Sequence, residues 1–152
     1  MKYLIFFNRV VVDSLLVVIT LILLVQVLSR YLFGIPLVWT EELARYLFVW
    51  VAFLGIGYGV SERSHIQINF FTKNLSPKKL LGIRLFIEFL TLGAVIYLAP
   101  YCWELFDDQR YVMSSVLQIP MSWIVLALPV GLISYIIFSS HQSILDIKRI
   151  RG

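Results

Sequence analysis

Charged residues flank a wholly apolar stretch of this sequence, and they are the residues best placed to bind a partner. Arg30, Glu41, Glu42 and Arg45 precede the stretch, and no charged residue occurs from Tyr46 to Ser61. A soluble amphipathic helix carries charges along one face throughout its length. Here the charges stop abruptly, as they do where a helix enters lipid. The sequence therefore predicts a polar cluster at the start of a membrane helix.

Local pairing accounts for part of this cluster. Thr40 can cap the helix, and negative charge at Glu41 and Glu42 in its first turn is favoured by the helix dipole. Glu41 and Arg45 are four residues apart, so an ion pair between them is expected. Glu42 has no obvious local partner, and Arg45 lies a turn into the predicted membrane helix. We therefore expect another protein to contact both.

Two further acids near apolar stretches have basic residues at helical spacing. Asp13 follows Arg9 by four residues, and Glu88 follows Arg84 by four. Both pairs are expected to form ion pairs on one helix face. Glu88 is the acid that lies deepest in an apolar stretch, where an ion or proton role is the competing interpretation.

No catalytic, cofactor-binding or metal-binding set is predicted. Cys102 is the single cysteine of the sequence, which excludes an intrachain disulfide and a cysteine zinc cluster. His65 and His141 fall at or near the ends of different apolar stretches, and no serine, histidine and acid share a supporting spacing. We therefore expect that the protein is not an enzyme.

Small residues and a proline suggest how the helices pack. Gly55 and Gly59 have the small-xxx-small spacing that lets another helix approach closely. Gln26 is expected to form an interhelical hydrogen bond, and Pro129 to kink the last apolar stretch.

Composition indicates an integral membrane protein. Of 152 residues, 60% are hydrophobic and 14% are charged, and the mean hydropathy is +0.87. Soluble domains have about 25% charged residues. Because the basic residues lie next to apolar stretches, they favour membrane topology and lipid headgroups over nucleic acid.

The predicted fold is a single all-α membrane domain over residues 1–152. A membrane helix needs roughly 20 mostly apolar residues. Four stretches qualify, at about residues 10–29, 43–61, 81–102 and 119–140.

Basic residues predict the orientation of these spans. With a cytoplasmic N-terminus, ten of the 13 basic residues lie inside and three lie outside. Both termini are therefore expected in the cytoplasm. The outer three are Arg30, Arg45 and Arg110, and the inner ten are Lys2, Arg9, Arg63, Lys73, Lys78, Lys79, Arg84, Lys148, Arg149 and Arg151.

The segment from Ser64 to Pro77 is too short and too polar to cross the bilayer. Its apolar residues could line one face of an amphipathic helix on the cytoplasmic surface. The competing interpretation is an extended segment, with Ile66 and Ile68 opposite Gln67 and Asn69.

Several blocks together resemble the small membrane subunit of tripartite ATP-independent periplasmic (TRAP) transporters, over nearly the whole chain. The most specific are Arg30-Tyr31-Leu32-Phe33 and Glu41-Glu42-Leu43-Ala44-Arg45. The supporting blocks are Gln26 to Ser29, Phe53-Leu54-Gly55, His65-Ile66, Ile119-Pro120 and Pro129-Val130-Gly131.

The resemblance implies a non-catalytic permease subunit in a bacterial inner membrane. Such a subunit is a scaffold for a large multi-span subunit, which moves like an elevator and binds substrate and sodium ions. A periplasmic binding protein delivers an organic acid such as a dicarboxylate or a sialic acid. By position, the matching residues that would hold the subunit's shape or contact the large subunit are Arg30, Glu41, Glu42, Arg45 and His65.

Charged residues in the last outer loop, Asp107, Asp108 and Arg110, are candidates for docking the binding protein, although solvation alone explains them equally well. Two other function classes remain open. An autonomous four-helix exporter or channel acting as a dimer would need Glu88 in a shared cavity. A haem anchor would need His65 and His141 at facing depths.

Overall fold

The computed structural model describes residues 2–61 and 77–151, and its regular secondary structure in those residues is helical. In those residues the extended pairing is limited to an isolated bridge between Met113 and Pro120. The predicted all-α class is therefore confirmed. The helices are α1 (Lys2–Leu32), α2 (Val38–Ser61), α4 (Pro77–Asp108), α5 (Ser122–Val125) and α6 (Ala127–Arg151).

Three helical stretches of the described residues are long and apolar enough to cross a membrane. They are Tyr3–Leu32, Leu85–Asp108 and Ser122–Leu145, and they overlap the first, third and fourth predicted spans. The second predicted span lies in α2, a helix of 24 residues. Crossing of the membrane by α2 remains a prediction. The predicted surface helix and His65 lie outside the described residues.

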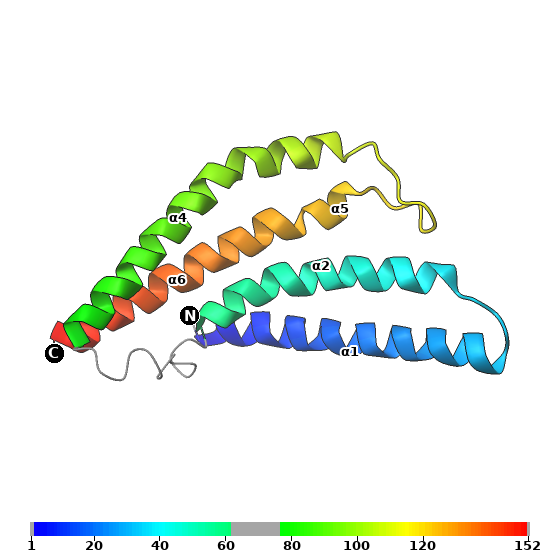
Figure 1. Ribbon diagram of the computed structural model, residues 1–152, viewed down its shortest axis with the longest axis horizontal. Coiled ribbons are helices and arrows are strands. Elements are labelled where there is room, and N and C mark those ends of the chain that lie inside the picture. Colours follow the sequence, from blue (N-terminus) through cyan, green and yellow to red (C-terminus); the bar gives the residue numbers. More distant parts are fainter. Residues whose placement is uncertain (1, 62–76, 152) are drawn as a thin grey trace.

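The four long helices form a single row (Figure 1). α1 packs on α2, α2 packs on α6, and α6 packs on α4, so α2 and α6 are central. Both chain ends lie towards one end of the row, and the α1–α2 turn and the α4–α5 connection lie towards the other. A single row leaves apolar side chains exposed on all four helices, as membrane helices require.

The central crossing of α2 and α6 depends on two glycines that sequence reasoning did not select for packing. A Cβ atom at Gly131 would lie 2.7 Å from both the Cβ atom and the carbonyl oxygen of Phe53. At Gly57 it would lie 3.0 Å from the Cβ atom of Ser134.

The predicted pair, Gly55 and Gly59, plays no such part within the described chain. A Cβ atom at either glycine would meet nothing within 4 Å. This surface of α2 is therefore open, and packing of Gly55 and Gly59 against a helix of another protein stays a prediction.

The turn between α1 and α2 is built by a glycine and a serine. Gly34 has a φ of +68°, in the left-handed region that glycine adopts at little cost. The hydroxyl of Ser29 donates to the carbonyl of Ile35 at 2.8 Å, which ties the turn to the end of α1. The start of α2 is thereby held beside α1.

A proline explains the interruption between α5 and α6. The helix is interrupted at Leu126, between Val125 at the end of α5 and Ala127 at the start of α6. Pro129 has no amide hydrogen to donate to the carbonyl of Val125, and its ring crowds that carbonyl. The expected kink near Pro129 is therefore present as a break one turn earlier. α4 also contains a proline, Pro100, and bends along its length in Figure 1.

Candidate functional site

Glu42 is the centre of the polar cluster at the start of α2, and its partners lie within this chain. The side chain is only 8% exposed. One carboxylate oxygen accepts hydrogen bonds from the amides of Val116 at 2.8 Å and Leu117 at 3.1 Å, and the other accepts from the hydroxyl of Tyr46. The expectation that Glu42 lacks a partner within the chain is therefore wrong, because the α4–α5 connection and Tyr46 supply donors; a contact of Glu42 with another protein stays a prediction.

The α4–α5 connection is an ordered hairpin, which we call the α4–α5 hairpin (residues 109–121). The Ser114 amide donates to the Ile119 carbonyl at 2.9 Å, and the Met121 amide donates to the Val112 carbonyl at 2.8 Å. The Ser114 hydroxyl also accepts from the Ile119 amide at 3.1 Å. These bonds hold the turn so that two successive amides point at Glu42.

Hydrogen bonding keeps Glu42 ionised. The Tyr46 hydroxyl lowers the pKa of Glu42 most, and contacts with Ser114 and the amides of Leu117 and Val116 lower it further, while burial opposes them. The folded pKa therefore lies below the ordinary value of 4.5. A lowered folded pKa contributes stability above the ordinary value, and that contribution is lost as the pH falls through the folded pKa.

Acidification should therefore release the α4–α5 hairpin. We expect hydrogen-exchange protection of the Val116 and Leu117 amides, corrected for intrinsic exchange, to stay constant from about pH 7 to 5 and to fall below about pH 4.5. Mass spectrometry of the detergent-solubilised chain measures this hydrogen-exchange protection. Glu42→Gln is the control, and its protection should not change with pH. A wild-type profile as flat as that of the variant would contradict the charged tether.

Glu41 binds α1 instead of its expected partner Arg45. Its Oε1 atom accepts a hydrogen bond from Gln26 Nε2 of α1 at 2.7 Å. The predicted interhelical bond of Gln26 is thus confirmed, and the Glu41–Arg45 ion pair is not formed. Thr40 is a further correction: α2 begins two residues earlier, and the Thr40 hydroxyl donates to the Leu37 carbonyl instead of capping the helix.

The arginines of the cluster stay exposed. Arg30 lies in the last turn of α1, and Arg45 lies about two turns into α2. Neither forms an ion pair with a carboxylate in the described residues, where Arg9 and Asp13 do so at 3.6 Å, as predicted. Arg30 and Arg45 are therefore available to groups outside the described chain.

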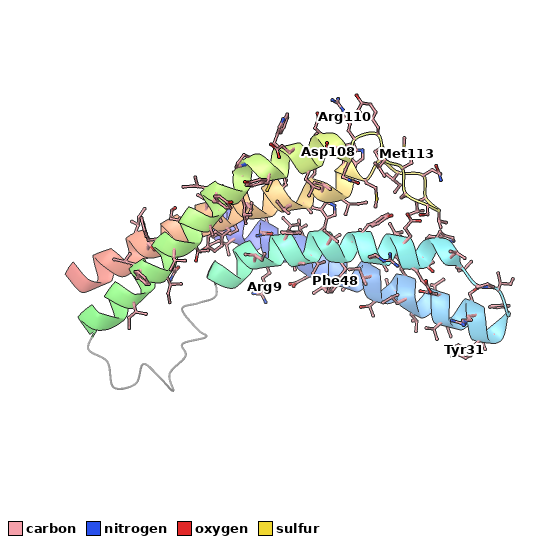
Figure 2. The ribbon with its side chains drawn as sticks, turned by 45° about the horizontal axis from the view of Figure 1, so that its top comes forward. Arg9, Tyr31, Phe48, Asp108, Arg110 and Met113 are labelled. Carbon is pink, nitrogen blue, oxygen red and sulfur yellow. The ribbon has the colours of Figure 1, made fainter. Side chains whose placement is uncertain are left out.

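The candidate docking residues lie at the end of α4. Asp107, Asp108 and Arg110 are all exposed. Figure 2 shows Asp108 and Arg110 near the start of the α4–α5 hairpin, at the outer edge of the row.

Glu88 of α4 binds α6. Its carboxylate accepts from the Ser139 hydroxyl at 3.0 Å and from the Ser143 hydroxyl. The side chain of Arg84, its expected partner, lies outside the described part. Because Ser139 and Ser143 are four residues apart, one face of α6 supplies both donors.

Sequence reasoning missed the α4–α5 hairpin because its contacts with α2 span 74 and 75 residues. Local spacing could have found one partner, since Tyr46 follows Glu42 by four residues. It could not have found the amides, because every residue except proline carries one.

Comparison with known proteins identifies the family. The family model "Tripartite ATP-independent periplasmic transporters, DctQ component" matches residues 19–149. The sialic acid TRAP transporter small permease protein SiaQ of Vibrio cholerae is 29% identical over 128 residues, 82% of this chain and 72% of that protein. The C4-dicarboxylate TRAP transporter small permease protein DctQ of Rhodobacter capsulatus is 38% identical over 107 residues, 64% of this chain and 44% of that protein.

A much longer relative contains a similar segment. The sialic acid TRAP transporter permease protein SiaT of Haemophilus influenzae is 37% identical over 110 residues. These are 72% of this chain but 18% of SiaT, so the chain spans less than a fifth of that relative. All these relatives are transporter components and not enzymes. Since the family model matches most of its length, this chain belongs to the DctQ component family of TRAP transporters.

Proposed function

We propose that this chain is the non-catalytic small permease subunit of a sodium-coupled, binding-protein-dependent importer of organic acids. In that role it is a scaffold for a larger membrane subunit. The names of its relatives, which refer to sialic acid and C4-dicarboxylates, support an organic acid as substrate.

The single row of helices is the observation that carries the scaffold role. Two central helices, α2 and α6, are flanked by the edge helices α1 and α4. A row has no enclosed interior in which a solute could cross, whereas transport sites lie between helices near the midplane. The row does present broad apolar faces. Packing of one such face against a neighbouring membrane protein would make that protein's scaffold wider.

The length of SiaT supports a large partner. The segment similar to this chain is 18% of SiaT, so most of that permease consists of other sequence. We infer that a separate, larger multi-span subunit supplies the corresponding part here.

The proposed membrane arrangement is one domain, residues 1–152, in the bacterial inner membrane. Residues 10–29, 43–61, 81–102 and 119–140 would cross it, with both termini in the cytoplasm. The distribution of basic residues supports this orientation. The position of the α1–α2 turn and the α4–α5 hairpin towards the same end of the row agrees with it.

Different residues would serve different partners. Arg30 at the end of α1 and Arg45 near the start of α2 are exposed and could bind carboxylates of the large subunit, and His65 stays a candidate contact. Asp107, Asp108 and Arg110 would face the periplasmic binding protein. The open surface at Gly55 and Gly59 could receive a helix of the large subunit.

The autonomous exporter is less well supported. It would need Glu88 as an ionisable group in a cavity shared by two copies. Both carboxylate oxygens of Glu88 already accept serine hydroxyls of α6 in the same chain. This arrangement favours a structural tie between α4 and α6.

Gentle purification from the host tests the subunit role. We expect a large multi-span protein to be recovered with this chain in equal amount, identified by mass spectrometry. Arg45→Ala should lower the recovery of the large protein with this chain roughly tenfold, because loss of an arginine buried in an interface can weaken binding by that much. Asp13→Asn, at an exposed ion pair on α1, is the matched control. Recovery of the chain only as a homodimer would contradict the proposal.

A further inference from the structure

The α4–α5 hairpin must lie at a membrane surface. It connects two helical stretches, Leu85–Asp108 and Ser122–Leu145, that are each long and apolar enough to cross the bilayer. Only 13 residues, 109–121, separate these stretches. The hairpin therefore cannot extend far from the surface at which both stretches end.

The hairpin exposes two large apolar side chains. Tyr111 and Met113 are 84% and 53% exposed. Ser114, which follows Met113 in the chain, is buried. Met113 also forms the isolated bridge with Pro120 that joins the two sides of the hairpin. Glu42 ties the hairpin to α2 through the amides of Val116 and Leu117.

Exposed aromatic residues also occur near the ends of the helices that meet at this end of the molecule. Trp103 near the end of α4 and Trp123 of α5 are 71% and 61% exposed. Tyr31 at the end of α1 (Figure 2) and Phe33 in the α1–α2 turn are also exposed. Tryptophan and tyrosine concentrate where a bilayer meets water, because their rings are apolar with one polar group.

We propose that Tyr111 and Met113 insert into the headgroup interface of the bilayer, so that the α4–α5 hairpin is a lipid anchor. The lipid surface fits better than a protein partner because two separate connections, at α1–α2 and α4–α5, present the same kind of side chain. A flat surface such as a bilayer can contact both connections at once. The proposal does not depend on a large subunit or on which side of the membrane the hairpin occupies.

Spin-label accessibility tests the anchor in the full chain. In a Cys102→Ser background, nitroxides are attached at Met113→Cys and, as the matched control, at Ser115→Cys, which is exposed two residues further along the hairpin. The chain is placed in bilayers of phosphatidylethanolamine and phosphatidylglycerol. We expect the label at 113 to collide with dissolved oxygen and to lose access to a water-soluble nickel chelate, and the label at 115 to keep that access.

Two outcomes would overturn the proposal. Equally high access of the nickel chelate to the labels at 113 and 115 would mean that the edge of the hairpin lies in water. Low access to both reagents at position 113 would mean that protein covers it. Neither outcome affects the co-purification test, so failure of the lipid anchor and failure of the subunit role can be distinguished.

Discussion

Replacing Gly131 with alanine is expected to disrupt the crossing of α2 and α6 more than any other single methyl group added to a glycine. The new Cβ atom would lie 2.7 Å from the carbonyl oxygen of Phe53 and 2.9 Å from its carbonyl carbon. Because these are backbone atoms of a helix, no side-chain rotation relieves the clash. Overpacking of this kind costs about 1–3 kcal/mol, against a gain of up to about 1 kcal/mol from the higher helix propensity of alanine.

Denaturation of the purified chain in mild detergent measures this effect, and the glycines of α2 are its controls. Gly55→Ala and Gly59→Ala add a methyl group that meets nothing within 4 Å. They should leave stability unchanged or raise it by up to about 1 kcal/mol. Gly57→Ala should fall between, since its nearest contact is a side-chain atom at 3.0 Å. Equal stability of the Gly131 and Gly55 variants would refute the close crossing.

These glycines show what a spacing pattern can and cannot predict. Small residues four apart indicate that a helix can be approached closely. The pattern does not say which face of the helix turns towards its neighbour. In α2, Gly57 faces α6, whereas Gly55 and Gly59 meet open space. The rotation of α2 follows from all of its contacts together, and no short motif records it.

The helices themselves could be predicted because the bilayer requires continuous backbone hydrogen bonding. Their lengths could not. α1 runs over Lys2–Leu32, well beyond the predicted residues 10–29. Apolarity reports where a helix is in contact with lipid, whereas hydrogen bonds continue the helix into polar surroundings. The estimate of about 20 residues per crossing therefore gives a minimum for each helix.

Charged residues were predicted correctly where the partner is local. Arg9 and Asp13 pair within one helix, as their spacing requires. Glu41 instead binds Gln26 of α1, and Glu42 binds amides 74 and 75 residues away. Glu41 was expected to pair with Arg45 and Glu42 to contact another protein, and tertiary contacts within the chain replaced both expectations. Only knowledge of which helices are neighbours could have separated these cases.

Replacing Glu42 with alanine should detach the α4–α5 hairpin from α2. The change removes the acceptor of the Val116 and Leu117 amides and of the Tyr46 hydroxyl. Hydrogen bonds to a charged group contribute more than neutral ones, and a donor left without its partner adds a further cost. We expect hydrogen-exchange protection of the two amides to fall roughly tenfold or more. Glu42→Gln keeps one carbonyl oxygen and should give an intermediate value.

The adjacent acid makes this experiment specific. Glu41→Ala removes a carboxylate one residue away, but that carboxylate binds Gln26 of α1 and does not contact the hairpin. It should loosen α1 from α2 and leave Val116 and Leu117 protected. If the two alanine variants exposed these amides equally, general loosening of the start of α2 would explain both. Selective exposure of the Val116 and Leu117 amides in the Glu42 variant would establish that one buried carboxylate connects the α4–α5 hairpin to α2. The surface of the hairpin would then keep a fixed position relative to the surface of α2.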